Sequence, residues 1–416
     1  MNSAVPHYIA KIEGHGSLKI DFTENTAQLN VHEGERLFED ILLGRNYLDG
    51  VFIPQRICGV CPTAHCMATI KALEDAFGVV PSETTRNFRK LMLAGQMIQS
   101  HALHLFFLVL PDYLKVDSAL SLAESDPDKF KLALSLKNVG DKIVEVVGGR
   151  PVHPITPMVG GFSKIPGRRD IEKLKAEIEL NLDNGRKVVD LFAGFKYPQF
   201  SKENEFLSIQ SDSKYGFYGG LIASTSGELF EIKDYRMHID EIVKPYSTAK
   251  FGRHHKESFM VGALARVNLH QEYLNPLTQE AIGANGIKLP STNSYKNNLA
   301  QAIEILHFLE EGVNLIDHIL DDGIASYKPE IKVRAGEGVG AVEAPRGTLY
   351  YSYKVDGRGT ITGCDIITPT VQNLSNIEAD AEEVLRNSKG KSPDERKKLL
   401  DMLVRAYDPC ITCSVH

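Results

Sequence analysis

The chain carries two Cys-x-x-Cys stretches, Arg56-Ile-Cys-Gly-Val-Cys-Pro-Thr-Ala-His65 and Asp408-Pro-Cys-Ile-Thr-Cys-Ser-Val-His416, near opposite ends of its 416 residues. Four thiolates form a soft, electron-rich ligand set that suits zinc, an iron–sulfur centre or a redox transition metal. To use all four in one site, the fold must bring residues 58–61 against residues 410–413. The kind of metal then decides the function.

A structural zinc site is the first alternative, because two Cys-x-x-Cys pairs are the usual zinc pattern. Zinc ribbons separate their pairs by about 15–20 residues, since the metal holds one small local unit together. Here most of the chain lies between the pairs, and a domain of this length needs no metal to fold. A redox disulfide is favoured even less, because neither pair opens a thioredoxin-like βαβ unit.

The composition is that of an ordinary globular protein, with 43% hydrophobic residues, 24% charged residues and no tryptophan. The length is enough for one large domain or two ordinary ones. Because the sequence has no internal repeat and residues 389–394 are only a local loop, we predict one domain, residues 1–416. The formal net charge is −7, and no basic run is long enough to follow a phosphate backbone. We therefore expect no nucleic-acid partner.

No membrane span or export segment is expected. The start of the chain, Met-Asn-Ser-Ala-Val-Pro-His-Tyr, lacks the charged and apolar regions of a signal peptide. The best apolar run, Leu103 to Leu110, is shorter than the ~20 residues that span a bilayer, and it contains His104. Six cysteines in so long a chain do not make a disulfide scaffold, so a reducing, cytoplasmic setting fits best.

The residue pattern predicts an α+β fold that is predominantly helical, with a helical middle and extended ends. Apolar residues at helical spacing predict helices over 84–110, stopped by Pro111, and over 171–193 and 298–320. Alternating residues predict a hairpin from 8–21 and 26–32, and strands at 349–355 and 360–367. A last helix begins at Ser392-Pro-Asp-Glu395, which has the residues of a capping box. That helix would deliver the second cysteine pair just past its end.

One glycine-rich stretch, Gly336-Glu-Gly-Val-Gly-Ala341, fits the relaxed dinucleotide fingerprint. The fingerprint requires a helix to begin at once, so that the helix N-terminus faces the pyrophosphate. Here Glu343-Ala-Pro-Arg-Gly347 and strand-like sequence follow instead. We therefore expect no nucleotide site at this position.

These motifs together closely resemble those of the large, catalytic subunits of nickel–iron hydrogenases. The two cysteine stretches are similar to the first and last signatures of that family. Shorter matches run along the whole chain: Ile12-Glu-Gly-His15, Phe38-Glu39, Ser100-His101 with Pro111-Asp112, Ala344-Pro-Arg-Gly347 and Thr368-Pro-Thr370. The sequence of residues 405–416 is most similar to that of the soluble, cytoplasmic multisubunit branch of the family. The resemblance implies a fold with a central bundle of long helices and small peripheral β-hairpins and sheets.

The resemblance also implies a nickel–iron centre. In the family, nickel takes all four cysteines, and two of them also bridge to an iron that carries cyanide and carbon monoxide. By motif position, Cys61 and Cys413 would bridge, while Cys58 and Cys410 would bind nickel alone. Cys410 would then be the first proton acceptor in the reversible cleavage of H2. Arg346 is the competing base, but a guanidinium is essentially always protonated, so we favour an electrostatic role for it.

Further residues would surround this centre by motif position. Asp112 and Asp408 would form a polar canopy over it together with Arg346. Thr370 would donate its hydroxyl to a cyanide ligand, because a buried anion needs hydrogen-bond donors. Pro345 belongs to the same cofactor-binding motif.

The resemblance gives roles to residues on either side of the thiolates. His65 suits a donor to a bridging thiolate, and Glu13 matches the proton-relay acid. Glu39 and His416 look like ligands of a separate hard-metal site, for Mg2+ or Fe2+, completed by the backbone carbonyl near Ile366 and by waters. The family matures by removal of an extension after this histidine, so a chain that stops there is expected to be a mature form.

The cysteine count implies partner subunits. Apart from the four motif cysteines, only Cys66 and Cys364 remain, and two cysteines cannot ligate a four-cysteine cluster. In the family, electrons leave through a small subunit with iron–sulfur clusters. In the soluble branch, further flavin and iron–sulfur subunits link it to NAD(P) or another soluble carrier. Two alternatives stay open: a quinone-reductase core subunit, which shares the fold but lacks the metal cysteines, and a zinc-stabilised structural protein.

Overall fold

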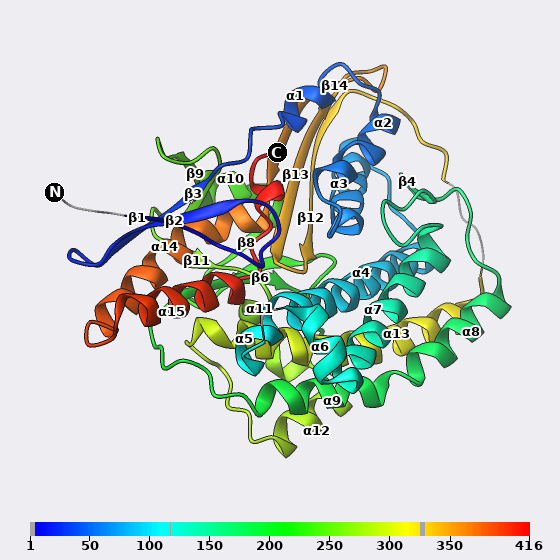
Figure 1. Cartoon of the computed structure of the whole chain (residues 1–416). Coiled ribbons are helices and arrows are strands. Elements are labelled where there is room, and N and C mark those ends of the chain that lie inside the picture. Colours follow the sequence, from blue (N-terminus) through cyan, green and yellow to red (C-terminus); the bar gives the residue numbers. More distant parts are fainter. Residues whose placement is uncertain (1–4, 117, 325–328) are drawn as a thin grey trace.

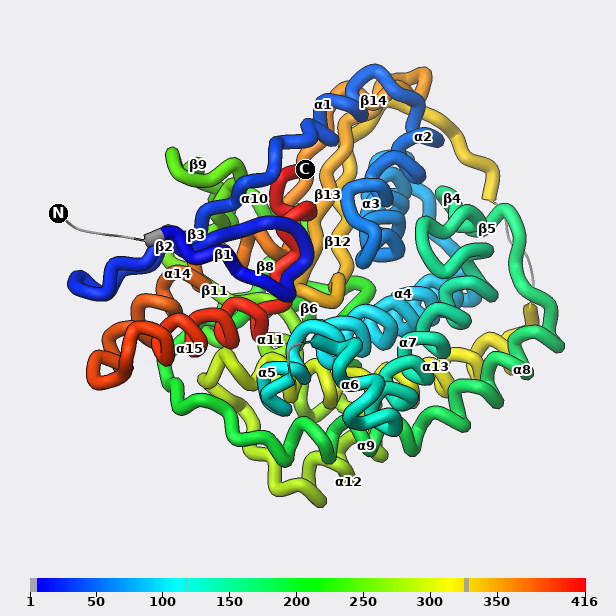
Figure 2. The backbone as a smooth tube through the Cα atoms, viewed as in Figure 1, coloured from blue at the N-terminus to red at the C-terminus, as the bar shows by residue number. Residues whose placement is uncertain are grey.

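The computed structural model describes residues 5–116, 118–324 and 329–416 and has the α+β, largely helical architecture that the sequence predicts. Figure 1 shows long helices gathered on one side of the molecule and small sheets on the other. In Figure 2 the C-terminal segment comes back to the N-terminal loop, where Glu13 forms a parallel bridge with Cys410. The two cysteine stretches meet at this place.

The long helices form a bundle around α4 (Glu83–Leu103), which packs against α7 (Pro127–Gly148) and α13 (Asn297–Asp322). Two glycines bring α4 and α7 together. A Cβ added to Gly95 would lie 2.9 Å from the carbonyl oxygen of Gly140, and one added to Gly140 would lie 2.6 Å from that of Gly95. The helix α13 confirms the helix that the sequence predicts over 298–320. Further helices of this side are α6 (Ala119–Ser125), α8 (Arg168–Glu179), α9 (Leu182–Ala193) and α12 (Pro276–Ala284).

The helix expected over 84–110 does not stop at Pro111, so that prediction is wrong at its end. After α4, a wider π-type turn, η2 (His104–Val109), leads into α5 (Leu110–Leu114). Pro111 lies in the first turn of α5, where the N–H groups have no intrahelical partner in any case. The helical path therefore continues past the proline to Leu114.

This helical stretch also bears on the expectation that the chain has no membrane span. Within the described residues, Glu83–Leu114 is long and apolar enough to cross a membrane by length and composition alone. However, 83% of its most apolar window is buried inside the protein. Its packing against α7 and α13 makes it a core helix of the bundle.

A three-stranded antiparallel sheet lies beside α3 (Pro62–Phe77). Its strands are β12 (Gly336–Ala344), β13 (Gly347–Val355) and β14 (Ile361–Ile367). β12 packs directly on α3, because a Cβ on Gly336, Gly338 or Gly340 would lie 2.2–2.4 Å from backbone atoms of that helix. The glycine-rich stretch therefore forms a strand that packs against α3. No helix begins there, as the sequence analysis expected.

The middle of the chain contains strands that the sequence analysis did not expect, so its helical middle is only partly right. One sheet has the order β11-β6-β7-β8 (Phe259–Met260, Glu205–Gln210, Leu221–Ser224, Leu229–Glu231), and β9 (Ile239–Val243) pairs with β10 (Lys250–His254). β6 is buried on both faces, which removes the apolar–polar alternation that marks a strand. The helix expected over 171–193 is in fact two helices, α8 and α9, separated at residues 180–181.

Both ends of the chain are organised around strands and caps. The expected N-terminal hairpin is present as β2 (Gly16–Asp21) and β3 (Thr26–Val31), and β1 (Val5–Tyr8) adds a third strand. Residues 9–15 leave this sheet as a loop, so 8–21 is not one strand. After β14, the chain forms α14 (Pro369–Asn387), α15 (Pro393–Ala406) with the expected capping box, and α16 (Ile411–Ser414). The remaining short elements are α1 (Phe38–Leu42), α2 (Tyr47–Phe52), η1 (Pro54–Ile57), β4 (Pro157–Met158), β5 (Gly161–Phe162), η3 (Ile232–Asp234), α10 (Tyr235–His238), α11 (Ala263–His270), η4 (Gln271–Tyr273) and η5 (Ser294–Lys296).

The contact between β12 and α3 gives a stability prediction. In Gly338→Ala, the new Cβ would lie 2.2 Å from the backbone nitrogen of Ala76 and 2.3 Å from the carbonyl oxygen of Ala72. The strand and the helix must separate, so we expect the free energy of unfolding to fall by about 1–3 kcal/mol. Gly357→Ala is the matched control, because nothing lies within 4 Å of its Cβ. Denaturant unfolding that gives both variants the stability of the parent would contradict the prediction.

Candidate metal centre

Two short segments bring the four cysteines together. Cys58 follows η1, Cys61 precedes α3, and Cys410 and Cys413 belong to the start and body of α16. The Sγ–Sγ distance is 3.3 Å for Cys58–Cys410, 3.0 Å for Cys410–Cys413 and 3.5 Å for Cys61–Cys413. The cysteines are not joined in disulfides, and each is at most 5% exposed. The sulfur atoms from both ends of the chain therefore form one buried cluster.

The chemistry of this cluster fits a bound cation. Burial raises the pKa of Cys410 and of Cys413 above that of an ordinary thiol, whereas hydrogen bonds from Cys410 and Cys413 lower the pKa of Cys58. Four thiols cannot all ionise in so small a dry volume without a compensating charge. A soft metal ion supplies that charge, because it binds thiolates and displaces their protons.

Arg36 and a glycine hold the cysteine stretches against each other. Nη2 of Arg36 donates to the carbonyl oxygen of Ile57 (2.6 Å) and to that of Thr412. Gly14, in the loop after β1, has φ +82°, and a Cβ on it would lie 2.7 Å from Cβ of Ile411. The N-terminal loop can approach α16 this closely because position 14 is glycine.

Arg346 lies in the turn between β12 and β13 and is held by Asp408. Nε of Arg346 donates to the carbonyl oxygen of Asp408 (2.7 Å), and Nη2 donates to its Oδ1 (2.8 Å). The neighbouring Pro345 is fixed from behind, because its carbonyl oxygen accepts a hydrogen bond from Nη2 of Arg266 (3.0 Å). Burial opposes the charge of Arg346, but Asp408 and the nearby cysteines outweigh burial and raise its pKa. In this state the side chain supplies positive charge and hydrogen-bond donors.

Asp112 does not take part in that ion pair. Among the described residues, its carboxylate pairs with Arg405, whose Nε donates to Oδ2 (2.6 Å), and with Lys11, whose Nζ donates to Oδ1 (3.2 Å). Arg405 also donates to the carbonyl oxygen of Ala10 (2.9 Å). Asp112 therefore ties α5 to the end of α15 and to the N-terminal loop.

Thr370 and His65 contact the cysteines directly. Oγ1 of Thr370 accepts a hydrogen bond from the N–H of Cys410 (3.0 Å), which leaves the hydroxyl hydrogen free to donate. Nε2 of His65 lies 3.7 Å from Sγ of Cys413, and its Nδ1 lies 2.7 Å from the hydroxyl of Tyr351. Burial lowers the pKa of His65 to about 4, so the imidazole is neutral at neutral pH. Tyr351 thus fixes the ring that faces the sulfur.

A short hydrogen-bonded path leads from the cysteines to Glu13. The hydroxyl of Thr412 lies 3.7 Å from Sγ of Cys410 and donates to Oε1 of Glu13. The N–H of Thr412 donates to Oε2 (3.1 Å), so the carboxylate is held at both oxygens. The sequence analysis named Glu13 but missed Thr412, although its place inside the second Cys-x-x-Cys pair was a signal. Tyr351 was missed too, because it lies in a strand with other buried tyrosines.

Glu39 and His416 meet at a separate point, the backbone of Ile366 in β14. The N–H of Ile366 donates to Oε1 of Glu39 (2.8 Å), and Nε2 of His416 lies 2.8 Å from the carbonyl oxygen of Ile366. Nδ1 of His416 lies 2.9 Å from the carbonyl oxygen of Cys413. A neutral imidazole has one N–H and cannot donate to both carbonyls. A cation beside one nitrogen would remove this conflict, and both side chains line a cavity of about 260 Å³.

Comparisons with known proteins agree with this geometry. A family model described as nickel-dependent hydrogenase matches residues 36–141 and 201–416. The alpha subunit of sulfhydrogenase 1 from Pyrococcus furiosus is 37% identical over 98% of this chain and 96% of its own length. The beta subunit of the NAD-reducing hydrogenase HoxS from Cupriavidus necator is 29% identical over 98% of this chain and 93% of its own length.

A solved structure leads to the same family. An NAD+-reducing NiFe-hydrogenase in the H2-reduced state has a TM-score of 0.86 and 26% identity, covering 99% of this chain and 98% of that chain. The four-cysteine cluster argues against a relative that lacks the metal cysteines, and the family match argues against a zinc-stabilised structural protein. The chain belongs to the nickel-dependent hydrogenase family, in which it is the catalytic large subunit of a nickel–iron hydrogenase.

Proposed function

We propose that residues 1–416 act as one catalytic domain that cleaves H2 reversibly into protons and electrons and passes the electrons to an iron–sulfur subunit. The observation that carries this proposal is the buried cluster of four cysteine sulfurs with contacts of 3.0–3.5 Å. The names of the relatives support it, because they include an NAD-reducing hydrogenase subunit and a sulfhydrogenase subunit.

In this proposal the cysteines divide into two kinds of ligand. Cys58 and Cys410 would bind nickel alone, and Cys61 and Cys413 would also hold an iron that carries cyanide and carbon monoxide. When bound, the metal centre supplies the Lewis acid on which H2 is polarised. His65 orients the Cys413 thiolate through its contact at 3.7 Å.

Two side chains would serve as donors to the anionic iron ligands. Thr370 is 2% exposed. Its oxygen accepts a hydrogen bond from the N–H of Cys410, and its own hydroxyl hydrogen remains to donate to another group. Arg346 carries further N–H groups beyond those that bind Asp408. Pro345 shapes the turn that presents Arg346. These donors would meet the need of a buried anion for hydrogen bonds.

Protons would leave through Cys410, Thr412 and Glu13. The thiolate of Cys410 accepts the proton, the Thr412 hydroxyl relays it, and the Glu13 carboxylate receives it at the molecule's half-buried N-terminal loop. We favour an electrostatic role for Arg346 over that of the base, because its pairing with Asp408 raises its pKa. Asp408 and Asp112 would hold this arrangement in place.

A hard cation, Mg2+ or Fe2+, would bind between Glu39, His416 and the carbonyl oxygen of Ile366. Carboxylate and carbonyl oxygens are the donors that such ions prefer. The two nitrogens of His416 that face carbonyl oxygens at 2.8 and 2.9 Å support a cation here. It would hold the C-terminal segment, and with it Cys413, against β14.

The electrons require partner subunits. Exposed apolar side chains lie near the first cysteine pair. Leu48 and Phe52 are on α2, which precedes this pair in the chain. Ile155 is in a loop that reaches the same region, because His153 of that loop contacts the backbone of Gln55. We propose that a small subunit with iron–sulfur clusters covers this face, and that flavin and iron–sulfur subunits link it to NAD(P) or another soluble carrier in the cytoplasm. Such an interface is expected to bury about 2,000 Å² or more in total.

Replacing one bridging ligand tests the metal centre. Cys413→Ser should lose bound nickel and iron, the infrared bands of cyanide and carbon monoxide, and H2 uptake, because serine is a poor ligand for soft metals. Cys66→Ala is the matched control, since Cys66 is equally buried but lies outside the sulfur cluster. Elemental analysis that finds zinc instead of nickel in the parent, or full H2 uptake by Cys413→Ser, would refute the assignment.

The proton path gives a second test. Glu13→Gln keeps the shape of the side chain but cannot carry a proton, so H2/D+ exchange should fall by roughly 10²–10⁴-fold at unchanged nickel content. Thr412→Val, which removes the relaying hydroxyl, should lower exchange in the same way. Glu33→Gln is the control, because its carboxylate binds His15 and not Thr412. Exchange at the parental rate in Glu13→Gln would show that protons leave by another route.

The partner face gives a third test. Phe52→Asp combined with Ile155→Asp should weaken co-purification with the cluster-bearing subunit and lower dye reduction by H2, because both apolar side chains become charged at the interface. H2/D+ exchange by the large subunit reports on whether the metal centre itself is intact. Leu180→Asp is the control, since Leu180 is 80% exposed on the far helical side. An unchanged complex would place the partner on another face.

A further inference from the structure

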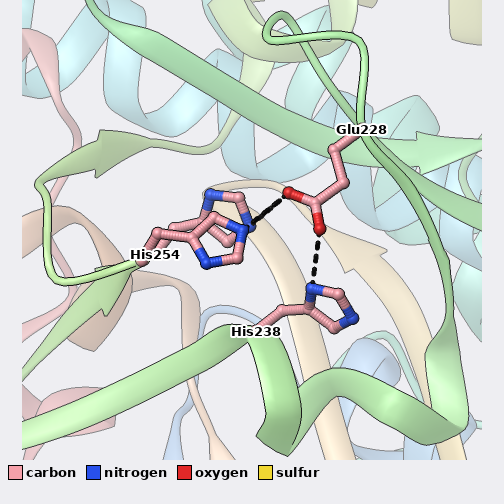
Figure 3. Close-up of side chains that lie close together, drawn as sticks. Glu228, His238 and His254 are labelled. Carbon is pink, nitrogen blue, oxygen red and sulfur yellow. Dashed lines mark hydrogen bonds and ion pairs between the residues drawn. The ribbon is translucent and has the colours of Figure 1, made fainter.

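A second group of potential metal ligands lies outside the cysteine centre. Glu228 precedes β8, His238 ends α10, His254 ends β10, and His255 follows it. One nitrogen or oxygen of each of these four side chains lies within 4.8 Å of the others. Figure 3 shows Glu228, His238 and His254 pointing toward one another. We call this set the histidine cluster.

The contacts within the histidine cluster centre on one carboxylate. Oε1 of Glu228 lies 3.0 Å from Nδ1 of His238, and Oε2 lies 2.8 Å from Nε2 of His255 and 3.3 Å from Nε2 of His254. Nδ1 of His238 and Nε2 of His254 are buried, and neither makes a well-aligned hydrogen bond with any described residue. Buried imidazole nitrogens that are close to a carboxylate without bonding to it call for an explanation.

Glu205 on β6 fixes the orientation of His254. Oε2 of Glu205 lies 3.0 Å from Nδ1 of His254, which places the N–H of the ring at this nitrogen. The other nitrogen, Nε2, then carries a lone pair that faces a second acceptor, the carboxylate of Glu228. Two acceptors face each other favourably only around a cation or a proton. A carboxylate behind a histidine is also the usual support of a metal-binding imidazole.

The two remaining histidines are held in place by their surroundings. The ring of His238 stacks on Phe230, with centroids 3.9 Å apart and planes at 8°. His255 and Lys256 have φ +47° and +70° in a two-residue turn that is closed by backbone hydrogen bonds between His254 and Glu257. Such turns favour Asn and Gly, because φ is positive at both positions. Here the turn instead carries a histidine, whose ring centroid lies 4.1 Å from that of His254.

We propose that the histidine cluster binds a divalent first-row transition cation, with Zn2+ as the best fit. Three imidazole nitrogens and one carboxylate oxygen complete a tetrahedral zinc site without an open position. The site is separate from the cysteine cluster and from Glu39 and His416. Its role is structural, since it joins β8, α10 and β10 within one local unit, residues 228–255.

Zinc binding by the purified protein, with any subunits it carries, tests the proposal. The comparison is between the parent and a double variant, His238→Phe with His255→Asn. Phenylalanine keeps the stacking on Phe230, and asparagine tolerates the positive φ, so both changes preserve the local fold. Loosely held metal is first removed, and ZnCl2 is then added. The parent should bind one more zinc ion per chain than the double variant. The affinity of the double variant for zinc should be at least about 100-fold weaker.

Two further variants separate a metal site from a cluster of ion pairs. Glu205→Gln should weaken zinc binding by about 10–100-fold without changing the number of zinc ions bound, because it removes only the support of His254. His7→Gln is the control. It removes a histidine–carboxylate pair, His7 with Asp401 at 2.7 Å, that belongs to no group of potential metal ligands among the described residues. Zinc binding should be unaffected in this variant.

X-ray absorption at the zinc edge shows which ligands the zinc uses. Nitrogen and oxygen ligands at about 2.0–2.2 Å would support the histidine cluster, whereas sulfur ligands at about 2.3 Å would report on the cysteines. Equal zinc in parent and double variant, only sulfur-bound zinc, or a melting temperature that follows pH but not zinc would overturn the proposal. Nickel content and the infrared bands are read in the same samples, so failure here is distinguishable from failure of the hydrogenase assignment.

Discussion

Four thiols in one dry pocket can ionise together only if a cation lies among them, and the structure around the metal centre follows from this constraint. Cys58 and Cys410 are 352 positions apart, so the protein must close a very long loop before the sulfur atoms meet. The entropic cost of closure rises slowly with length, and the bundle around α4 together with the β12–α3 contact provides ample burial to offset it. Packing therefore builds the site, and the metal does not have to fold the chain, in contrast to a zinc finger.

Buried ion pairs then position the groups around the sulfur atoms. Arg266 is fully buried and donates to both Glu304 and Glu343, and also to the carbonyl oxygens of the turn before Arg346. That turn holds Arg346 where it meets Asp408. A buried pair adds little net stability against a well-packed apolar core, but breaking it leaves an uncompensated charge. The pairs therefore favour one arrangement of the turn, which is what a centre with several fixed donors requires.

The sequence predicted most of the features that have local causes. The capping box at Ser392 and the apolar stripe of α13 depend on residues a few positions apart, and both are present. The predictions that were wrong depend on surroundings. Pro111 ends a helix by local rules, but the π-type turn before it puts the proline in a first turn. β6 shows no alternation because tertiary packing covers both of its faces. Asp112 is a different case, because its role stays a prediction from motif position. Its pairing with Arg405 depends on how α5 and the end of α15 pack, which the sequence does not show.

The histidine cluster shows why one kind of metal site is visible in a sequence and another is not. The cysteine motifs hold two ligands within one turn of chain, whereas the histidine cluster takes Glu228, His238 and His254 from three elements of a region whose strands were not expected. Only the adjacent pair His254-His255 was visible, and two neighbouring histidines are weak evidence alone. The cluster also connects to the metal centre through the fold. Next to Tyr235, Arg236 of α10 donates Nε to Oδ2 of Asp365 at 2.7 Å, and Asp365 precedes the β14 residue that meets Glu39 and His416. A cation that fixes the end of α10 would thereby also steady the strand against which the C-terminal cysteines are held.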